Sequence, residues 1–121
     1  MEKKTKLRPL CLLKILYEKT DMDHPLSTSE LIAFMDSEHG LHVYRTTIAA
    51  DIEQLKKFGI DVRTIKTASN QYYIGNRLFS LSELKLLIDA VESSKFITEE
   101  KSKELVGKLI SLASENKASE L

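Results

Sequence analysis

Histidine and cysteine, the side chains that most often hold metals or act as nucleophiles, are scarce in this sequence. The chain contains three histidines and one cysteine, namely His24, His39, His42 and Cys11. His39 and His42 are three residues apart, but they lie on either side of a glycine, and no cysteine or acid completes a recognisable metal set. We therefore interpret the histidines as unrelated surface residues and predict no metal site.

Acidic residues that could form a catalytic pair occur at two places. Asp21 and Asp23 fall in an irregular stretch, whereas Glu99 and Glu100 open a predicted helix. Carboxylates in the first turn of a helix are stabilised by its dipole, which explains the second pair without catalysis. No Ser/His/Asp or Cys/His arrangement can be assembled from the sequence. We predict that the protein is not an enzyme and that it uses no cofactor.

Basic residues offer a different chemistry, which is contact with nucleic-acid phosphate. The chain has 18 basic and 18 acidic residues, but their distribution is uneven. Residues 1–19 carry six basic and two acidic residues (+4), and residues 43–77 carry six and three (+3). Residues 20–42 carry no basic and five acidic residues (−5), and residues 78–121 carry six basic and eight acidic residues (−2). Charge runs usually form solvated surfaces, so this distribution alone does not establish a nucleic-acid binder.

The size and composition of the chain restrict its class. A sequence of 121 residues has room for one domain, or for one domain with an appendage. Its single cysteine excludes an internal disulfide and fits a reducing compartment. The N-terminus lacks the apolar core of a signal peptide, and no apolar run approaches the length of a membrane span. We expect a soluble, cytoplasmic protein.

The first basic block coincides with a predicted helix. Residues 6–19 have the apolar spacing of an amphipathic helix, and Pro9 places its start near Arg8, because proline is tolerated in a first turn. The expected inward-facing residues are Leu10, Leu13, Leu16 and Tyr17. Lys4 and Lys6 would then lie on a basic arm that precedes the helix.

Two more helices are predicted in close succession. Ser27 and Glu30 form a capping box in front of a helix that ends at Gly40, with Leu31, Ile32, Phe34 and Met35 on its apolar face. The next helix occupies the stretch from Val43 to Gly59. Its expected inward residues are Tyr44, Ile48, Ile52 and Leu55. A short glycine-containing turn between two amphipathic helices predicts a helix-turn-helix.

The outward face of the third helix is mostly small and polar. Its central row is Thr46, Ala50, Glu53 and Lys57, and the flanking residues are Arg45, Thr47, Ala49 and Gln54. Such a face behind a basic first turn suits insertion into a DNA major groove. An ordinary surface helix has the same periodicity, so the neighbouring elements have to decide between the two interpretations.

After Gly59 the periodicity changes from that of a helix to that of a strand. Residues 60–66 and 71–75 flank a small polar connection, which predicts a β-hairpin. A helix-turn-helix followed by a hairpin is the order of a winged helix, and Arg63 and Lys66 would lie along the wing. A hairpin that only covers the core is a serious alternative.

The last third of the chain predicts two helices. Ser80 and Glu83 form a second capping box, and Thr98 caps a final helix that extends to about Glu115. The polar tail after it is expected to be frayed. Leucines in the final helix repeat at the spacing of a coiled-coil seam and predict an apolar ridge that needs a partner. The residues expected to mediate dimerisation are Leu84, Leu87, Val91, Leu105, Leu109 and Leu112.

The order of these elements resembles the N-terminal part of WYL-domain transcriptional regulators, which are bacterial winged-helix proteins with a DeoR-like helix-turn-helix. The resemblance extends from Lys6 to about Glu120. The matching residues are Arg45, Thr47, Ile48, Asp51, Ile52, Leu55, Phe58–Gly59–Ile60, Tyr72–Tyr73–Ile74–Gly75, Leu84–Lys85–Leu86–Leu87 and Ser93–Ser94–Lys95–Phe96–Ile97–Thr98.

This resemblance implies a winged-helix DNA-binding domain at 1–77 and a helical linker or dimerisation segment at 78–121. It also implies a C-terminal sensor domain, absent from this sequence, whose ligand is unknown. The third helix departs from the family pattern at Thr46, Ala49 and Ala50, where lysine, tyrosine and arginine are common. Fewer basic residues at phosphate-facing positions reduce both DNA affinity and its salt dependence.

We therefore predict a sequence-specific transcriptional regulator that binds double-stranded DNA as a homodimer. Its recognition helix would occupy about 44–58 in the major groove, and residues 60–75 would form the wing. The predicted DNA-contacting residues are Lys4, Lys6, Arg8, Arg45, Thr46, Thr47, Gln54, Lys57, Arg63 and Lys66. The alternative, suggested by the alanines at 49 and 50, is a winged-helix protein-interaction module with weak or no DNA binding.

Overall fold

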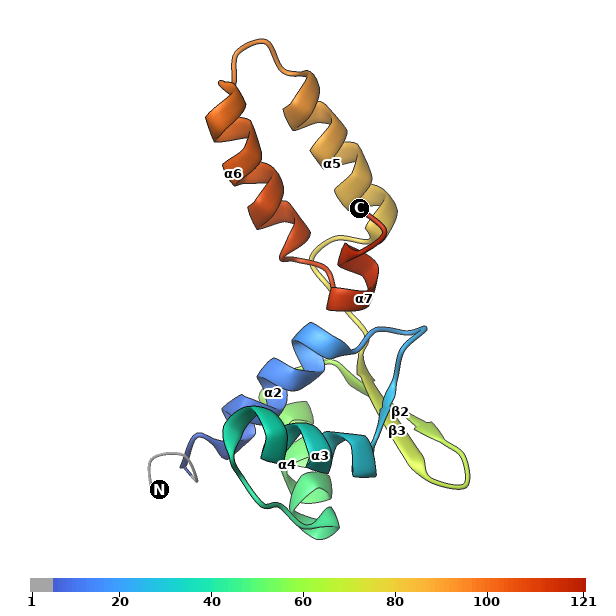
Figure 1. Ribbon diagram of the computed structural model, residues 1–121. Coiled ribbons are helices and arrows are strands. Elements are labelled where there is room, and N and C mark those ends of the chain that lie inside the picture. The colour runs from blue at the N-terminus through green and yellow to red at the C-terminus, as the bar shows by residue number, and fades with distance from the viewer. Residues whose placement is uncertain (1–5) are drawn as a thin grey trace. The chain divides into compact units, whose positions relative to one another are not determined.

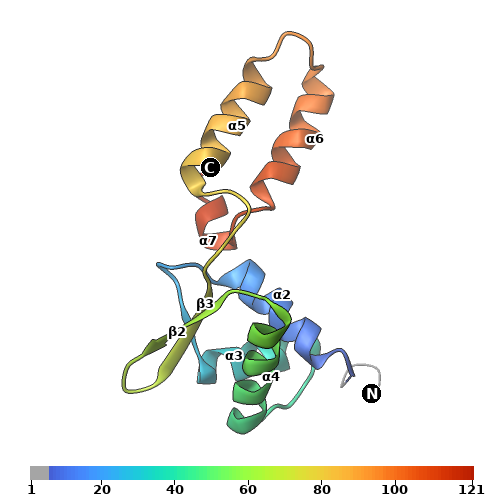
Figure 2. The same ribbon diagram turned by 180° about the vertical axis from the view of Figure 1, so that it is seen from behind.

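The structure is a computed structural model that describes residues 6–121. This part of the protein contains six helices and three short strands (Figures 1 and 2). In chain order they are α2 (Arg8–Lys19), β1 (Leu26–Ser27), α3 (Thr28–His39), α4 (Arg45–Phe58), β2 (Val62–Lys66), β3 (Asn70–Ile74), α5 (Leu81–Ser93), α6 (Glu99–Ile110) and α7 (Glu115–Ala118). The chain divides into two compact units, Met1–Asn76 and Arg77–Leu121, and the expected boundary lies one residue further along. The predicted fold class, mainly α-helical with a small β-hairpin, is confirmed at the level of secondary structure: the chain is mainly helical, and the hairpin is part of a small three-stranded antiparallel sheet.

The core of the first unit lies between three helices and the sheet. Helices α2, α3 and α4 pack against one another, and β3 contacts both α2 and α3 (Figure 1). The buried apolar residues of this core are Leu12, Ile15, Leu16, Leu31, Met35, Val43, Ile48, Ile52, Leu55, Val62, Tyr72 and Ile74. Burial of side chains of this size is the main favourable contribution to folding of such a unit.

Helix α2 buries a face that overlaps the predicted one only in part: Leu16 is buried and Leu13 packs against the core as predicted, but Leu10 and Tyr17 do not enter it. Leu12, Ile15 and Leu16 are buried, whereas Leu10 is 59% exposed and Tyr17 is also exposed. Both sides of this helix are apolar in sequence, so periodicity alone could not select between them. The selection is tertiary, because Arg8 at one end of α2 and Thr20 beyond the other end are both hydrogen-bonded to other elements.

The predicted burial of Tyr44 is also wrong. Helix α4 begins at Arg45, and Tyr44 precedes it with an extended backbone (φ −96°, ψ 160°). A residue outside the helix does not follow the helical wheel, and the Tyr44 side chain is 79% exposed. Val43, one residue earlier, is buried in its place.

Local signals fixed the ends of α3 and α4 as predicted. The Ser27 Oγ accepts a hydrogen bond from the Glu30 N–H at 3.2 Å, and the Glu30 carboxylate accepts one from the Ser27 N–H at 3.0 Å. Gly40 and Gly59 end the two helices with φ of 65° and 114°, in the left-handed region that glycine adopts without strain.

The sheet contains the predicted hairpin and one strand that we did not predict. Strands β2 and β3 pair antiparallel from Val62 opposite Ile74 to Lys66 opposite Asn70. Strand β1 pairs with the other edge of β3, where Leu26 lies opposite Tyr72, so the strand order is β1-β3-β2. Only two residues of β1 pair, and this is too short a segment to give a strand pattern in the sequence.

The second unit is a helical hairpin followed by one short helix. Helices α5 and α6 pack antiparallel (Figure 1). Their starts are capped as predicted, by the Ser80–Glu83 capping box and by Thr98, whose hydroxyl accepts from the Lys101 N–H at 3.2 Å.

The predicted continuous helix to Glu115 and the frayed tail after it are wrong. Helix α6 ends at Ile110, and Ser114 caps α7 by accepting from the Lys117 N–H at 3.1 Å. The Ser111 hydroxyl donates to the Lys108 carbonyl at 2.6 Å. Serine side chains compete for backbone groups in this way, which favours helix ends and caps over helix interiors.

Within residues 6–121, no helix combines the length and the apolar composition that crossing a membrane requires.

Candidate nucleic-acid interface

The start of α4 presents an exposed basic side chain that is fixed by a neighbouring helix. Arg45 is the first residue of α4, and its Nη2 donates to the Ser29 Oγ at 2.5 Å. Ser29 lies in the first turn of α3. The hydrogen bond therefore holds the Arg45 guanidinium on the side of α4 that faces the start of α3.

The N-terminus of α4 is also open to an anionic ligand. No side chain caps it, and its first turn contains no acidic residue. The first N–H groups of such a helix have no partner within the helix, and together with the helix dipole they favour an anion such as phosphate. Tyr44 stands beside this terminus with an exposed phenol ring.

The outward face of α4 is exposed over the length of the helix. Its exposed residues are Arg45, Thr46, Ala49, Ala50, Glu53, Gln54, Lys57 and Phe58, and Thr47 is half-buried. The opposite face is formed by Ile48, Asp51, Ile52 and Leu55, all of which are buried. The predicted contact residues on this helix thus share an accessible surface, although Thr47 lies at its edge.

A buried carboxylate, whose structural role was not predicted from the sequence, joins α4 to α2. Asp51 accepts hydrogen bonds from Arg8 at 2.7 Å (Nε to Oδ2) and 3.1 Å (Nη2 to Oδ1). These hydrogen bonds raise the pKa of Arg8 above its ordinary value. The Arg8 guanidinium, which we predicted on DNA phosphate, is therefore engaged in joining α2 to α4. An acid among the apolar residues of a buried face was the signal in the sequence.

The other predicted N-terminal contacts lie ahead of α2. Lys6 is exposed. Lys4 falls outside the residues that the structure describes.

The hairpin carries two exposed cations in different environments. Arg63 on β2 pairs with Asp61, with 3.1 Å between Nη2 and Oδ2. Hydrogen bonding to Asp61, and after that to Tyr73, raises the pKa of Arg63. Lys66 is exposed at the end of the same strand, next to the exposed loop 67–69.

A glycine leaves the space for the Arg63–Asp61 pair. A Cβ atom at Gly75 would clash with Arg63 Nε and would lie 2.5 Å from Asp61 Oδ2. The close approach of this backbone thus explains a glycine at a strand end.

Helix α4 and the hairpin are also linked directly. Lys56 donates from Nζ to the Thr64 Oγ1 at 3.1 Å, and the same ammonium group lies 3.6 Å from the Glu53 carboxylate. The hairpin is therefore positioned by the same helix that presents the exposed face.

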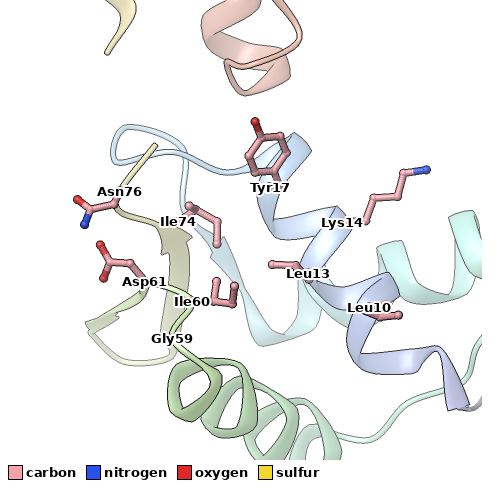
Figure 3. A pocket seen from close by; sticks show the side chains of 9 residues that line it. All are labelled: Leu10, Leu13, Lys14, Tyr17, Gly59, Ile60, Asp61, Ile74 and Asn76. Carbon is pink, nitrogen blue, oxygen red and sulfur yellow. The ribbon is translucent and has the colours of Figure 1, made fainter. Parts of the chain in front are cut away.

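A separate apolar groove lies on the first unit. Its volume is about 550 Å³, and its lining residues are Leu10, Leu13, Lys14, Tyr17, Gly59, Ile60, Asp61, Ile74 and Asn76 (Figure 3). Three of the four residues that we predicted to face inward from α2 line this groove. Lys14 and Asp61 contribute one positive and one negative charge to it.

Residues 6–121 contain no cluster of three or more metal-ligating side chains. His24 instead contacts Asp21, with 2.8 Å between Nδ1 and Oδ1. Asp21 also accepts from the Asp23 N–H at 3.0 Å. The two aspartates therefore belong to one turn, in which the Asp21 carboxylate organises the backbone before β1.

The predicted dimerisation residues differ in how much surface they present. Leu84 is only 1% exposed and therefore belongs to the interior of the protein. The other five, Leu87, Val91, Leu105, Leu109 and Leu112, are half-buried. The most exposed leucine of α5 is Leu86, at 71%, and it was not among the predicted interface residues.

Comparisons of the chain with protein-family models, with curated proteins and with solved structures find no match. The resemblance to WYL-domain regulators therefore rests on the sequence patterns quoted above, and DNA binding stays a prediction.

Proposed function

We propose that the chain is a DNA-binding transcriptional regulator of the WYL-domain type, whose first unit is a winged helix. The observation that carries this proposal is the start of α4. An exposed arginine, Arg45, lies beside an uncapped helix N-terminus with no acid in the first turn. A helix with this terminus and an exposed outer face has the features of a recognition helix in a major groove.

The neighbouring elements support this proposal. Helix α3 stands in the place of the first helix of a helix-turn-helix, and its Ser29 hydroxyl positions the Arg45 guanidinium. The hairpin β2–β3 stands in the place of the wing, with Arg63 and Lys66 exposed on it. In this proposal Lys6, Thr46, Thr47, Gln54 and Lys57 complete the contact surface. Arg8 acts indirectly, since it holds α2 against α4.

Binding of the full chain to duplex DNA tests the proposal. Fluorescence anisotropy with DNA from upstream of its own reading frame should give an affinity that falls steeply with salt, by a log–log slope of about 0.9 for each phosphate contacted. Arg45→Ala should weaken binding by about 1–3 kcal/mol if the guanidinium contacts a base, and by a similar factor on all sequences if it contacts only phosphate.

A matched control removes a charge elsewhere. The control variant is Lys103→Ala, at an exposed residue of α6. This variant should bind DNA with the same affinity as the parent chain. Absence of binding to any duplex at low salt would contradict the proposed function.

One observation favours a second function, in which the same scaffold binds a protein partner. The groove along α2 is lined by Leu10, Leu13 and Tyr17 and has a cation and an anion among its lining residues (Figure 3). An amphipathic helix with apolar residues on one face and charges of both signs beside them would match it. If random duplex DNA gives no salt-dependent binding at all, this second function is favoured over the first.

A further inference from the structure

The middle of the exposed face of α4 contains no cation. Residues 46–55 include neither lysine nor arginine. Arg45 precedes this stretch and is bonded to Ser29 at 2.5 Å, and Lys56 follows it and is bonded to Thr64 at 3.1 Å. The two cations next to the stretch are therefore held by other elements, and Lys57 lies in the last turn of the helix.

The absence of cations matters because each base is recognised in the major groove by different types of side chain. Guanine presents two acceptors in the major groove and is read most often by arginine or lysine. Thymine presents a methyl group there, which is read by apolar contact with alanine or with the methyl of threonine, and adenine is read by the amide of asparagine or glutamine. The middle of the face, which contains no cation, is therefore poorly suited to guanine.

The exposed residues of α4 fit the chemistry of an A·T base pair. Thr46, Ala49 and Ala50 are exposed residues whose side chains carry a methyl group, and Gln54 is an exposed residue whose side chain ends in an amide. Thr46, Ala50 and Gln54 are spaced at i, i+4 and i+8, so they follow one row along the helix. At 1.5 Å per residue the row spans about 12 Å, which corresponds to three or four base pairs at about 3.4 Å each.

Glu53 is the remaining exposed side chain in this part of the helix. Its carboxylate lies 3.6 Å from the Lys56 ammonium group, which partly offsets its charge. The other exposed side chains within residues 46–55 carry only methyl groups, one hydroxyl and one amide.

We propose that α4 selects A·T base pairs in the major groove, reading thymine methyl groups with Thr46, Ala49 and Ala50 and adenine with Gln54. This inference rests on the proposed function, because it assumes that α4 enters a major groove. It adds to that function the class of sequence that the chain prefers.

Alternating polymers test the inference without knowledge of the operator. A labelled mixed-sequence duplex bound to the full chain is displaced with poly(dA-dT), poly(dA-dU) or poly(dI-dC). Uracil lacks the thymine methyl but keeps every hydrogen-bonding group, so poly(dA-dT) should compete better by about fourfold for each methyl contacted. Poly(dI-dC) resembles A·T in the minor groove and G·C in the major groove, so it should compete poorly.

A variant assigns the effect to the helix. Thr46→Ser removes the methyl and keeps the hydroxyl, so it should reduce the poly(dA-dT) preference over poly(dA-dU) by about fourfold. Thr98→Ser is the matched control, because it removes the same methyl from the cap of α6 while serine can keep the bond to the Lys101 N–H. Circular dichroism checks that both variants remain folded.

The outcomes separate this inference from the proposed function. If DNA binds but poly(dA-dT) and poly(dA-dU) compete equally, or if poly(dI-dC) competes as well as poly(dA-dT), selection through thymine methyl groups is overturned and DNA binding stands. If no duplex binds at low salt, the proposed function is overturned, and this inference with it.

Discussion

Asp51 on the buried face of α4 accepts two hydrogen bonds from Arg8 in the first turn of α2, at 2.7 and 3.1 Å. The two residues are 43 positions apart in the sequence. The pair fixes the rotation of α2 and thereby decides which of its two apolar sides enters the core. It also anchors α4 from its buried side, so that the opposite side faces outward.

Asp51→Asn should therefore destabilise the first unit. The substitution replaces a charged, two-oxygen acceptor at a buried site with a neutral amide, whose single oxygen can accept only one of the two Arg8 hydrogen bonds and whose NH2 group faces the other donor. The expected loss is about 1–3 kcal/mol, below the roughly 3–5 kcal/mol that breaking a fully buried pair costs, because Arg8 is partly exposed. Urea denaturation followed by tyrosine fluorescence measures it, since all four tyrosines lie between residues 17 and 73.

Glu53→Gln provides the control for this measurement. It changes an acid of the same helix two residues later, but on the exposed face, and should alter stability by no more than about 0.5 kcal/mol. Equal stability of Asp51→Asn and the parent chain would show that the ion pair makes no net contribution.

Thr20→Val should loosen the attachment of β3 to α2. The buried Thr20 hydroxyl accepts from the Ile74 N–H at 3.0 Å and donates to the Leu16 carbonyl at 2.5 Å. Valine has nearly the same shape but leaves the Ile74 N–H without this acceptor, at an expected cost of about 1–3 kcal/mol. Amide hydrogen exchange at Ile74 should accelerate in this variant. Thr20→Ser keeps the hydroxyl, so the same amide should stay protected.

Asp61→Asn should strengthen DNA binding if the hairpin acts as a wing. The substitution weakens the ion pair that occupies Arg63 and removes a negative charge beside it. A released guanidinium that reaches one more phosphate should steepen the log–log salt dependence by about 0.9. Gly75→Ala offers an independent route to the same result, because its Cβ atom displaces both side chains. An unchanged salt dependence in both variants would place Arg63 away from DNA.

The Ser80–Glu83 capping box should make the start of α5 sensitive to acid. Hydrogen bonds from the Ser80 backbone and then from its side chain lower the pKa of Glu83 below its ordinary 4.5. Because the folded carboxylate has the lower pKa, its stabilising effect is complete above pH 4.5 and is lost as the pH falls through the folded value. An NMR titration of the Glu83 carboxyl should show a midpoint below 4.5, and Ser80→Ala should raise this midpoint only in part, because alanine keeps the backbone N–H that donates to Glu83.

Leu105→Asp combined with Leu109→Asp should give a folded monomer if α6 contributes to a homodimer. Both side chains are half-buried, so the charges oppose apolar contact while the hairpin keeps its other packing. Sedimentation velocity measures the assembly state, and circular dichroism checks the helices. A parent chain that is already monomeric would refute the dimer. If Leu86→Asp alone separates the copies, the interface lies on the exposed side of α5 instead.

The sequence predicted the elements whose signals are local. The two capping boxes and the glycines at 40 and 59 lie within a few residues of the backbone that they control, so both helix starts and helix ends could be read directly. The orientation of α2 could not, because it depends on contacts between residues more than 40 positions apart. Strand β1 was missed for the same reason, since its two residues are defined only by their pairing with β3.

The candidate site divides in the same way. The exposed row of α4 followed from helical spacing, and its buried row followed too, apart from Tyr44, which is exposed, and Asp51, which was not predicted to be buried. The role of Ser29 did not, because it lies 16 residues from Arg45 and meets it only through the packing of α3 on α4. Arg8 carried the charge expected of a phosphate contact, and only the buried Asp51 reveals its structural use.

Strand β3 occupies the centre of the sheet and is also the strand from which the chain continues into residues 77–80. It is bonded to β1 along one edge and to β2 along the other, and Thr20 holds its last residue. A force directed along the axis of β3 would load both ladders in shear, so that several hydrogen bonds would have to break together. A strand at the edge of the sheet could instead separate one hydrogen bond at a time. The central position of β3 therefore makes the first unit resistant to a force along this strand at the point where the chain leaves the unit.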